Sequence, residues 1–429
     1  MPIDWEPLMA TFVVPLVKIA VVLFALLTAA AYLVLLERWI AAWVQDRLGP
    51  NRVGIPLTRI KLFGLGQPLA DGLKFIFKEE YTPAHVDKAL YILAPITILA
   101  AAIAIFAVIP FGSVLPIQVP GVEGPIQLVV APGVDVGMIY IFAMSSIAVY
   151  GVILGGWASN NKYSFLGALR SSAQLIAYEI PLGLGILGVV LSVGSLRLED
   201  IIGVQANSGQ WNAFSQPLGL MVFLIASFAE AARLPFDLPE CEQELIGGYH
   251  TEYAGMKLLL FLIAEFLHMV VAAFLIVILF FGGWHFWGMN VAADDVISWP
   301  LALLRVFVLM AKVMAVILFF MLVRWSWPRF RFDQLMNLAW KVMLPLGLVN
   351  LVTVATTVEY VHVRELEGLD TSPWVAVIIG WVVALVAWTV AAWLAPLHTD
   401  NRPRLDAMRP PEFEPENRIV REPEIALPR

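Results

Sequence analysis

Nine apolar runs, each long enough to cross a lipid bilayer, constrain the fold of this chain more than any other feature. A transmembrane helix needs about 17–25 predominantly apolar residues. Of the 429 residues, 60% are hydrophobic and 14% are charged, whereas soluble domains carry about 25% charged residues. We therefore expect an all-α, polytopic membrane helix bundle with about nine transmembrane helices. The expected spans are 9–36, 89–109, 133–156, 172–194, 213–232, 255–283, 300–325, 338–359 and 373–396.

The fifth run is the weakest of the nine, because its end already carries Glu230. Residues 1–396 form a single predicted transmembrane domain. The stretch from 397 to 429 is rich in Pro, Arg and Glu and is expected to be a largely extended cytoplasmic tail.

The basic residues predict the orientation of the chain in the membrane. Alternate connections, together with the tail, carry 22 Lys and Arg residues, and the remaining connections carry 2. Because cytoplasmic loops are enriched in Lys and Arg, we expect the N-terminus outside and the C-terminus in the cytoplasm. Loops 37–88 and 230–257 should then share the cytoplasmic face. The Pro- and Gly-rich loop 111–132 should form a short cap on the outer face, for which a hairpin is one candidate structure.

The segment GQPLADGLKFIFKEE (66–80) predicts an amphipathic helix that lies in the plane of the membrane interface. Pro68 suits its first turn, and Asp71 suits its positive N-terminal end. At about 100° per residue, the polar and apolar side chains separate onto opposite faces. The polar stripe is Gln67, Asp71, Lys74 and Lys78, and the apolar one is Leu69, Leu73, Ile76 and Phe77. Two interpretations stay open: a membrane-surface anchor, or a lip over an opening to the lipid.

Three cations, Arg38, Arg47 and Arg52, are closely spaced at the end of the first span. They could serve as ordinary positive-inside anchors, or their planar guanidinium groups could bind acidic loops or a polar ligand head group. The acidic candidate is the stretch 228–252, FAEAARLPFDLPECEQELIGGYHTE, in which Arg233 is the only Lys or Arg. Its two prolines forbid one continuous helix, so we expect a folded polar loop.

Ionisable residues within the predicted spans are the strongest functional signal, because charges at membrane depth are rare and usually functional. Glu179, Glu230 and Glu265 lie on three consecutive spans, and His268 follows Glu265 on the same helix face. Such carboxyl groups can take and pass protons. The alternative is static pairing with the intramembrane cations, which are Lys18, Arg305 and Lys312.

Other chemistries find no support in the sequence. A single cysteine, Cys241, cannot hold an iron–sulphur cluster, and no two histidines are spaced for a metal or di-haem site. There is no phosphate-binding loop and no nucleophile constellation, and we expect no nucleic-acid partner. The pattern fits ion translocation or its coupling to another reaction.

Four segments resemble a known family. ERWIAAWVQDRLGPNRVG (37–54), GQPLADGLKFIFKEE (66–80), AYEIPLG (177–183) and AEAARLPFDLPECEQELIGGYHTEYAGMKLLLFLIAEF (229–266) closely resemble signature segments of the H-type membrane subunits of the proton-pumping NADH:quinone oxidoreductase, respiratory complex I. The segment 55–65 is longer than the usual link. The ninth span and the basic tail lie beyond the eight-span family core.

The resemblance implies a bacterial inner-membrane subunit that forms a quinone tunnel with two peripheral-arm subunits and couples quinone reduction to proton translocation. The substrate would be ubiquinone or menaquinone. FMN and iron–sulphur clusters would lie in partner subunits, because this chain would bind no cofactor alone and would have no redox centre of its own. The implied partners are the terminal-cluster iron–sulphur subunit, the quinone-site peripheral-arm subunit and small membrane subunits.

The resemblance also implies two sets of site residues. The quinone chamber would be lined or supported by Arg47, Arg52, Asp71, Lys74, Arg233, Asp237, Glu242 and Glu244. The coupling path would use Glu179, Glu230 and Glu265. Three alternatives remain: the coupling membrane subunit of an energy-converting hydrogenase-type complex, a stand-alone ion transporter, and a purely structural anchor.

Overall fold

The computed structural model describes residues 12–54, 63–117, 124–238, 245–287, 289, 298–368, 372 and 374–394. Within these ranges, eight helical segments are long and apolar enough to cross a membrane. They are α2 (Val14–Val44), α4 (Lys88–Ile105), α5 (Gly137–Ala158), α6 (Lys162–Val193), α11 (Gly255–Phe280), α12 (Trp299–Ser326), the continuous helical stretch 332–366, and α15 (Trp374–Leu394). The expected all-α membrane bundle is confirmed.

The stretch 332–366 is built from three consecutive pieces. It begins as α13 (Phe332–Asn337), passes through a π-helical segment η3 (Leu338–Met343) and continues as α14 (Leu344–Leu366). The remaining short elements are α3 (Gln67–Phe77), α7 (Leu198–Ser208), α8 (Asn212–Ser215) and the 3₁₀ turn η2 (Gly248–His250). Two short strands, β1 (Val114–Leu115) and β2 (Ile126–Gln127), pair antiparallel and make a small hairpin in the loop 111–132.

The fifth expected span is wrong as one continuous helix. The chain there forms α8 and then α9 (Pro217–Glu230). The 14 residues of α9 reach about 21 Å at 1.5 Å per residue, short of the roughly 30 Å hydrocarbon core. The rest of the passage is non-helical, from Ala231 to Leu238. Irregular backbone is tolerated at membrane depth only where protein buries it, and Ala231, Phe236 and Leu238 are all buried here.

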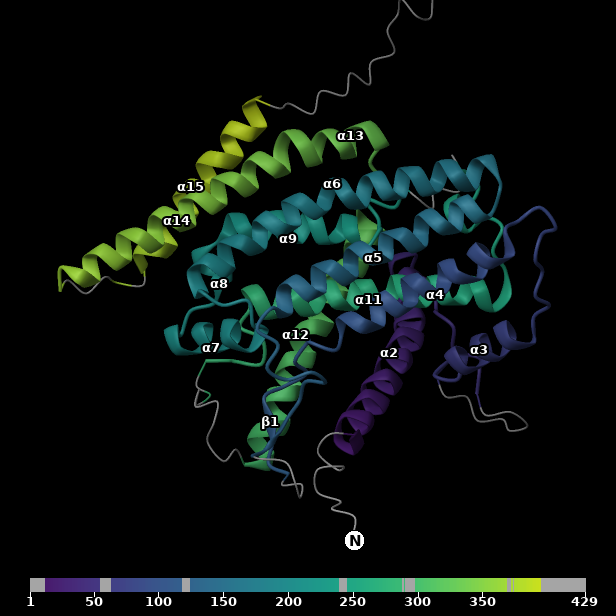
Figure 1. The fold of residues 1–429 in the computed structure, drawn as a ribbon, viewed down its shortest axis with the longest axis horizontal. Coiled ribbons are helices and arrows are strands. Elements are labelled where there is room, and N and C mark those ends of the chain that lie inside the picture. The colour runs from purple at the N-terminus through teal and green to yellow at the C-terminus, as the bar shows by residue number, and fades with distance from the viewer. Residues whose placement is uncertain are drawn as a thin grey trace, which may run out of the picture.

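Helix α11 lies at the centre of the bundle (Figure 1) and is the most deeply buried of the long helices. Helices α6 and α9 run side by side, and Gly185 of α6 allows this, because a Cβ there would stand 3.3 Å from the Gly219 carbonyl oxygen. Helix α15 lies at the edge of the bundle and has the smallest buried share of the long helices. The exposed apolar side chains of the outer helices are those expected of a surface that faces lipid.

The connections gather at two opposite ends of the bundle. At one, the hairpin end, Trp287 Nε1 donates to the Gly209 carbonyl (3.0 Å) and Lys18 Nζ to the Val129 carbonyl (3.0 Å). At the other, the cavity end, Tyr91 donates to the Glu252 carbonyl (2.6 Å) and the Phe330 amide to the Pro235 carbonyl (3.1 Å). Loops 37–88 and 230–257 meet at this end, as predicted, because Lys257 Nζ donates to Thr82 Oγ1 at 2.8 Å and Arg233 Nη1 lies 3.4 Å from Glu37 Oε2.

Helix boundaries follow local capping chemistry. Asp87 precedes α4 and accepts hydrogen bonds from the amides of Ala89 and Leu90 (3.1 and 3.3 Å), which the first helical turn leaves unpaired. Asn161 caps α6 by accepting from the Tyr163 amide at 3.0 Å. Gly194 ends α6 in the left-handed conformation (φ 76°), which a residue without a Cβ adopts at no steric cost.

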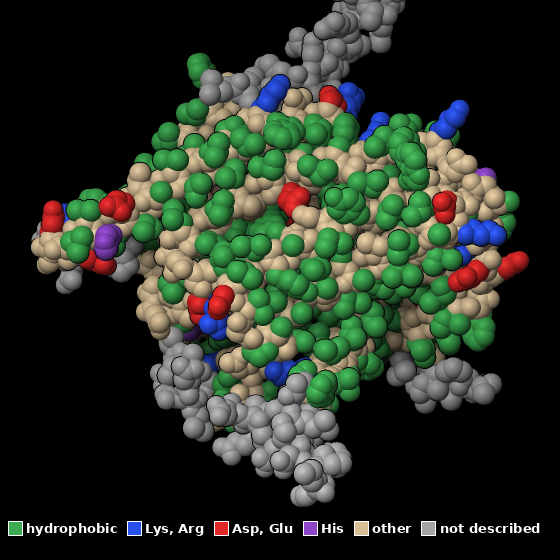
Figure 2. Space-filling view, viewed as in Figure 1, with side chains coloured by type: hydrophobic (Ala, Val, Ile, Leu, Met, Phe, Trp, Pro, Cys, Tyr) green, Lys and Arg blue, Asp and Glu red, His purple; other side chains and the backbone are tan. Residues whose placement is uncertain are grey.

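Hydrophobic side chains cover most of the face seen in Figure 2, and most of the charged side chains lie near its rim. Helix α3 stands apart from the long helices near the start of α4 (Figure 1). Its apolar residues are exposed, with Leu69 at 69% and Phe77 at 83%. The expected amphipathic helix is therefore present over 67–77 with Pro68 in its first turn, and its location in the plane of the membrane interface stays a prediction.

Candidate functional site

A cavity of about 1270 Å³ opens between α2, α3, α11 and the end of α12. We call it the chamber. Its walls along α2 and α11 are apolar and include Leu27, Val34, Leu259 and Ile263. Nine charged side chains gather around the rest of it: Glu37, Arg38, Arg47, Arg52, Asp71, Lys74, Arg233, Glu265 and Arg324. The chamber therefore combines an apolar wall with a charged region, and it is larger than the 300–1,000 Å³ common for ligand sites.

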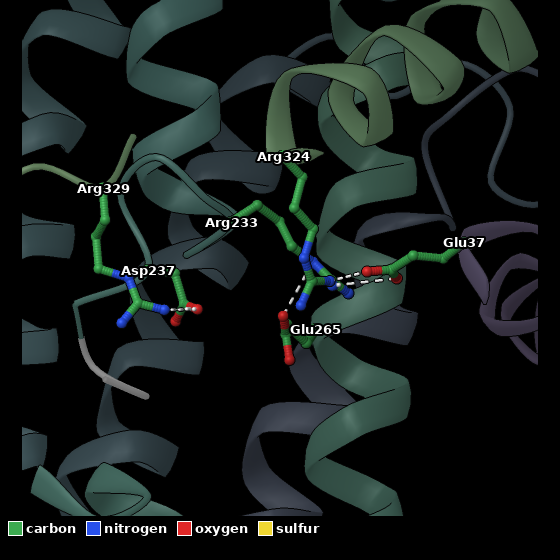
Figure 3. Close-up of polar contacts among 6 residues, drawn as sticks. All are labelled: Glu37, Arg233, Asp237, Glu265, Arg324 and Arg329. Atoms are coloured by element: carbon green, nitrogen blue, oxygen red, sulfur yellow. Dashed lines mark hydrogen bonds and ion pairs between the residues drawn. The ribbon is translucent and has the colours of Figure 1, made fainter. Parts of the chain in front are cut away.

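Two arginines and two glutamates converge at the inner part of the chamber (Figure 3). Arg233 Nε lies 2.9 Å from Glu265 Oε1, and Arg233 Nη1 lies 3.4 Å from Glu37 Oε2. The guanidinium of Arg324 also contacts Glu37. Arg233 is only 5% exposed and stacks over the Phe266 ring at 4.3 Å. Because breaking a buried ion pair is costly, this cluster should be rigid while its arginines and glutamates are charged.

The polar stripe of α3 faces the same chamber. Asp71 accepts from Arg38 Nη1 at 2.8 Å and from Gln67 Nε2 at 3.1 Å, and Lys74 lies 3.7 Å away. Asp71 does not belong to the first turn of the helix, so the expected interaction with the helix N-terminus is wrong. Its contacts are instead with neighbouring side chains, which tie α3 to α2.

A second, smaller cavity of about 60 Å³ lies between α5, α6, α9 and α11. We call it the acid cavity. Glu179, Glu230 and Glu265 all line it, together with His268. Ser145 donates a hydrogen bond to Glu230, and the next residue, Ser146, donates one to Glu179. Three helices thus bring the three predicted carboxyl groups around one space.

Glu265 is the one residue that lines both cavities among those the structure describes. It contacts Arg233 on the chamber side. Its position on α11, the buried central helix, follows from the sequence LLLFLIAEFLHMVV, in which Glu265 and His268 fall on one face. A change of charge in the chamber therefore acts at short range on a group of the acid cavity.

Five of the eight residues predicted to surround a quinone line the chamber: Arg47, Arg52, Asp71, Lys74 and Arg233. Asp237 does not line it and lies to one side (Figure 3), where Arg329 Nη2 stands 3.3 Å from its Oδ2. Glu242 and Glu244 lie outside the residues that the structure describes.

Four site residues were not singled out from the sequence: Glu37 and Arg324 in the chamber, and Ser145 and Ser146 in the acid cavity. Glu37 adjoins Arg38, and a Ser-Ser pair in the middle of an apolar run is a detectable signal. The idea that Arg38 would bind the acidic loop is not supported by its contact, since it pairs with Asp71.

Two of the three cations considered as static partners of the intramembrane acids contact backbone carbonyls instead. Lys18 donates to the Val129 carbonyl. Lys312 donates to the carbonyls of Phe281, Gly283 and His285 at 2.7, 3.0 and 2.6 Å. Both contacts lie at the hairpin end, and Glu179 and Glu230 take serine hydroxyls as partners instead.

The loop beside the acid cavity is anchored by aromatic contacts. Tyr253 stacks on Tyr91 with ring centroids 4.1 Å apart, and Tyr249 packs against His250. Burial lowers the pKa of His250 to about 4, so this imidazole is neutral at pH 7. Burial, with a smaller contribution from Tyr91, raises the pKa of Tyr253. In the described part of the chain, no group of three or more His, Cys, Asp or Glu side chains is placed to hold a metal ion.

The fold and the site together define an all-α, multi-pass membrane protein whose chamber is joined to carboxyl groups at membrane depth. Residues 17–355 match the family model described as NADH dehydrogenase. The chain is 47% identical to the first H-type subunit of the NADH-quinone oxidoreductase of Geobacter metallireducens over 346 residues, which is 80% of this chain and 96% of that protein. It is 41% identical to NADH-quinone oxidoreductase subunit 8 of Rhodothermus marinus over 362 residues, 83% of this chain and 97% of that protein. The chain belongs to the family of the H-type membrane subunits of NADH-quinone oxidoreductase, respiratory complex I.

Proposed function

We propose that the chamber binds the quinone substrate of complex I, and that this subunit passes the effect of quinone reduction to the acid cavity. The observation that carries the proposal is Glu265, which lines the chamber and the acid cavity together. The resemblance of the signature segments to the H-type membrane subunits supports the same assignment.

The lining of the chamber suits an amphipathic molecule with a polar head and a long apolar tail. Quinone carbonyl oxygens accept hydrogen bonds, and Arg47, Arg52 and Lys74 are donors that line the chamber. An isoprenoid tail would lie along the apolar residues of α2 and α11. Helix α3, with its exposed apolar face, would sit at the opening toward the lipid.

The coupling step would be electrostatic. Quinone reduction would take electrons from a partner subunit's iron–sulphur cluster and an equal number of protons to give a neutral quinol. Side chains of the chamber that supply those protons would change their own charge. Arg233 is held between Glu37 and Glu265, and the three form a continuous set of contacts from the chamber to the acid cavity. A change of charge at one of these three residues would alter the electrostatic potential at Glu265 and, across the acid cavity, at Glu230 and Glu179. These carboxyl groups would then release or take up protons.

The setting of this function would be the bacterial inner membrane, with the cavity end facing the cytoplasm. There the terminal-cluster iron–sulphur subunit and the quinone-site peripheral-arm subunit would close the chamber, and small membrane subunits would lie beside the bundle. FMN and the iron–sulphur clusters that deliver electrons would belong to partner subunits. Family membership favours this reading over a hydrogenase-type complex, a lone ion transporter or a structural anchor.

Replacing Glu230 with Gln tests the proposal, because Gln has nearly the same shape and cannot ionise. We expect the complex carrying Glu230→Gln to assemble but to lose quinone reduction, proton translocation or both. The measurements are NADH:quinone turnover and protons translocated per NADH in membrane vesicles. Glu199→Gln is the matched control, because Glu199 pairs with Arg197 at the hairpin end, away from both cavities.

Unchanged turnover and an unchanged proton yield in Glu230→Gln would refute the coupling role. Equal losses in Glu230→Gln and Glu199→Gln would show a general effect of removing a charge and would refute it equally. Loss confined to Glu230→Gln would support it.

A further inference from the structure

A single side-chain amide joins α6 to both ends of the segment that carries Glu230 and Arg233. Gln174 Nε2 donates to the Ala229 carbonyl at 2.9 Å and to the Phe236 carbonyl at 2.8 Å. Gln174 is fully buried, at 0% exposure. Two carbonyl oxygens around one amide atom require that atom to be the nitrogen, so the orientation of the amide follows from its partners.

The segment between those two carbonyls runs from the end of α9 into the non-helical passage that follows it. Glu230 points to the acid cavity, where it accepts from Ser145. Arg233 points to the chamber, where it contacts Glu37 and Glu265. The same short piece of backbone therefore carries residues of both cavities, and its shape sets how Glu230 and Arg233 lie relative to each other.

The backbone bonds of this segment beyond the end of α9 are irregular. The Ala232 amide donates to the Ala229 carbonyl (3.3 Å), the Arg233 amide to the Phe228 carbonyl (3.3 Å) and the Phe236 amide to the Arg233 carbonyl (2.8 Å). From outside the segment, the Phe330 amide donates to the Pro235 carbonyl (3.1 Å). Ala232 lies in the left-handed region with φ 49°, which costs free energy for a residue with a Cβ. Contacts from outside the segment must therefore help to hold this shape, and both N–H groups of Gln174 supply such contacts.

We infer that Gln174 is a positioning residue that couples the chamber to the acid cavity by clamping the segment from Ala229 to Phe236. It acts through backbone carbonyls and touches neither the ligand nor the acids. This inference rests on the proposed function, since it assigns to Gln174 the control of how charge changes at Arg233 reach Glu230. Without these two hydrogen bonds, each cavity keeps its own residues, but the position of Arg233 relative to Glu230 becomes less fixed.

A second buried glutamine provides a matched comparison. Gln205 is 1% exposed, and its Nε2 donates to the carbonyls of Ile201 (3.3 Å) and Ile278 (2.9 Å). It ties α7 to α11 at the hairpin end and lines neither cavity. A mutation there removes two donated hydrogen bonds at the same burial, together with the bond that Gln205 Oε1 accepts from the Asn212 amide at 3.1 Å. It therefore reports the cost of losing buried glutamine bonds away from both cavities.

The test compares Gln174→Met and Gln174→Glu with Gln205→Met in the assembled complex. Methionine keeps the length and loses both donors, and glutamate keeps the shape and loses the N–H groups. We expect the Gln174 variants to lower protons translocated per NADH by roughly two-fold or more, with the KM for quinone close to that of Gln205→Met. Hydrogen–deuterium exchange of residues 229–238 should accelerate by roughly ten-fold in the Gln174 variants only.

The outcomes separate this inference from the proposed function. Proton yield and exchange rates that match Gln205→Met would overturn the clamp, while an impaired Glu230→Gln would leave the proposed function standing. If neither Gln174 variant assembles, Gln174 is a folding residue and the positioning role is wrong. If Glu230→Gln has no effect, the proposed function fails, and exchange at 229–238 still decides whether Gln174 clamps the segment.

Discussion

At the scale of single residues, Arg233 and Arg47 illustrate how two arginines of one chamber can serve different purposes. Arg233 is 5% exposed and lies within 3.4 Å of two carboxylates. Arg47 is exposed and its Nε donates to Gln45 Oε1 at 2.7 Å. Removing one partner of a buried ion pair leaves an uncompensated charge and costs about 3–5 kcal/mol, whereas exposed contacts contribute about 0–1 kcal/mol.

We therefore predict that the same substitution has different effects at the two arginines: on stability at Arg233 and on quinone binding at Arg47. Arg233→Met should strand Glu265 beside a neutral side chain and lower the thermal stability of the complex, by an amount equivalent to about 3–5 kcal/mol. Arg47→Met should leave stability within about 1 kcal/mol and raise the KM for quinone, because it removes a donor that lines the chamber. Thermal unfolding and quinone titration of both variants would check this. Equal stability in the two variants would contradict the assigned burial of Arg233.

At the scale of elements, α3 combines a polar face bound to the chamber with an apolar face that is open. Asp71 and Lys74 line the chamber, and Leu69, Leu73, Ile76 and Phe77 are exposed. An exposed stripe of this kind in a membrane protein is expected to insert into the lipid interface. The helix would then hold the opening of the chamber at a fixed depth.

We predict that Phe77→Asp weakens this anchoring. Phe77 is 83% exposed, so the substitution removes no internal packing. Removing a phenyl group that is buried in lipid lowers the anchoring free energy of α3 by about 1.5–3 kcal/mol, which corresponds to at least a ten-fold weaker anchoring. The KM for a long-tailed quinone should rise, and the KM for a short-tailed, water-soluble quinone should change less. Lys78→Gln serves as the control at the exposed end of the same helix. Identical shifts for both quinones would argue against a role at the lipid opening.

At the scale of the whole molecule, the separation of loops into two ends allows the orientation to be tested. The distribution of basic residues, 22 against 2, predicts that the cavity end faces the cytoplasm. Lys78 is exposed at the cavity end, and Asn207 is exposed at the hairpin end.

We predict that a membrane-impermeant thiol reagent labels Lys78→Cys only from the cytoplasmic side and Asn207→Cys only from the opposite side. The single native cysteine, Cys241, would first be replaced by serine. Labelling in inside-out and right-side-out vesicles gives the answer directly. The reverse pattern would invert the orientation and remove the basis for placing the peripheral-arm partners over the chamber.

Much of this organisation was predictable, because apolar run length, proline position and basic-residue bias are local properties. The eight long helices, the amphipathic helix at 67–77 and the meeting of loops 37–88 and 230–257 all follow from them. The prediction of the fifth span as one helix failed. The run 213–232 is apolar enough for a span, yet α8 ends before Pro217, which begins α9, and α9 ends at Glu230.

The sequence by itself determined that this chain is a multi-pass helical membrane protein with acids at membrane depth. The reason is that the length and hydrophobicity of an apolar run, which allow a helix to cross lipid, are properties of consecutive residues. It also identified Glu179, Glu230 and Glu265 as a group. Only the tertiary structure decided which partners these acids take, because Ser145, Ser146 and Arg233 reach them from other parts of the chain. Contacts between separate helices depend on helix rotation and packing, and no local pattern encodes the shared position of Glu265 between two cavities.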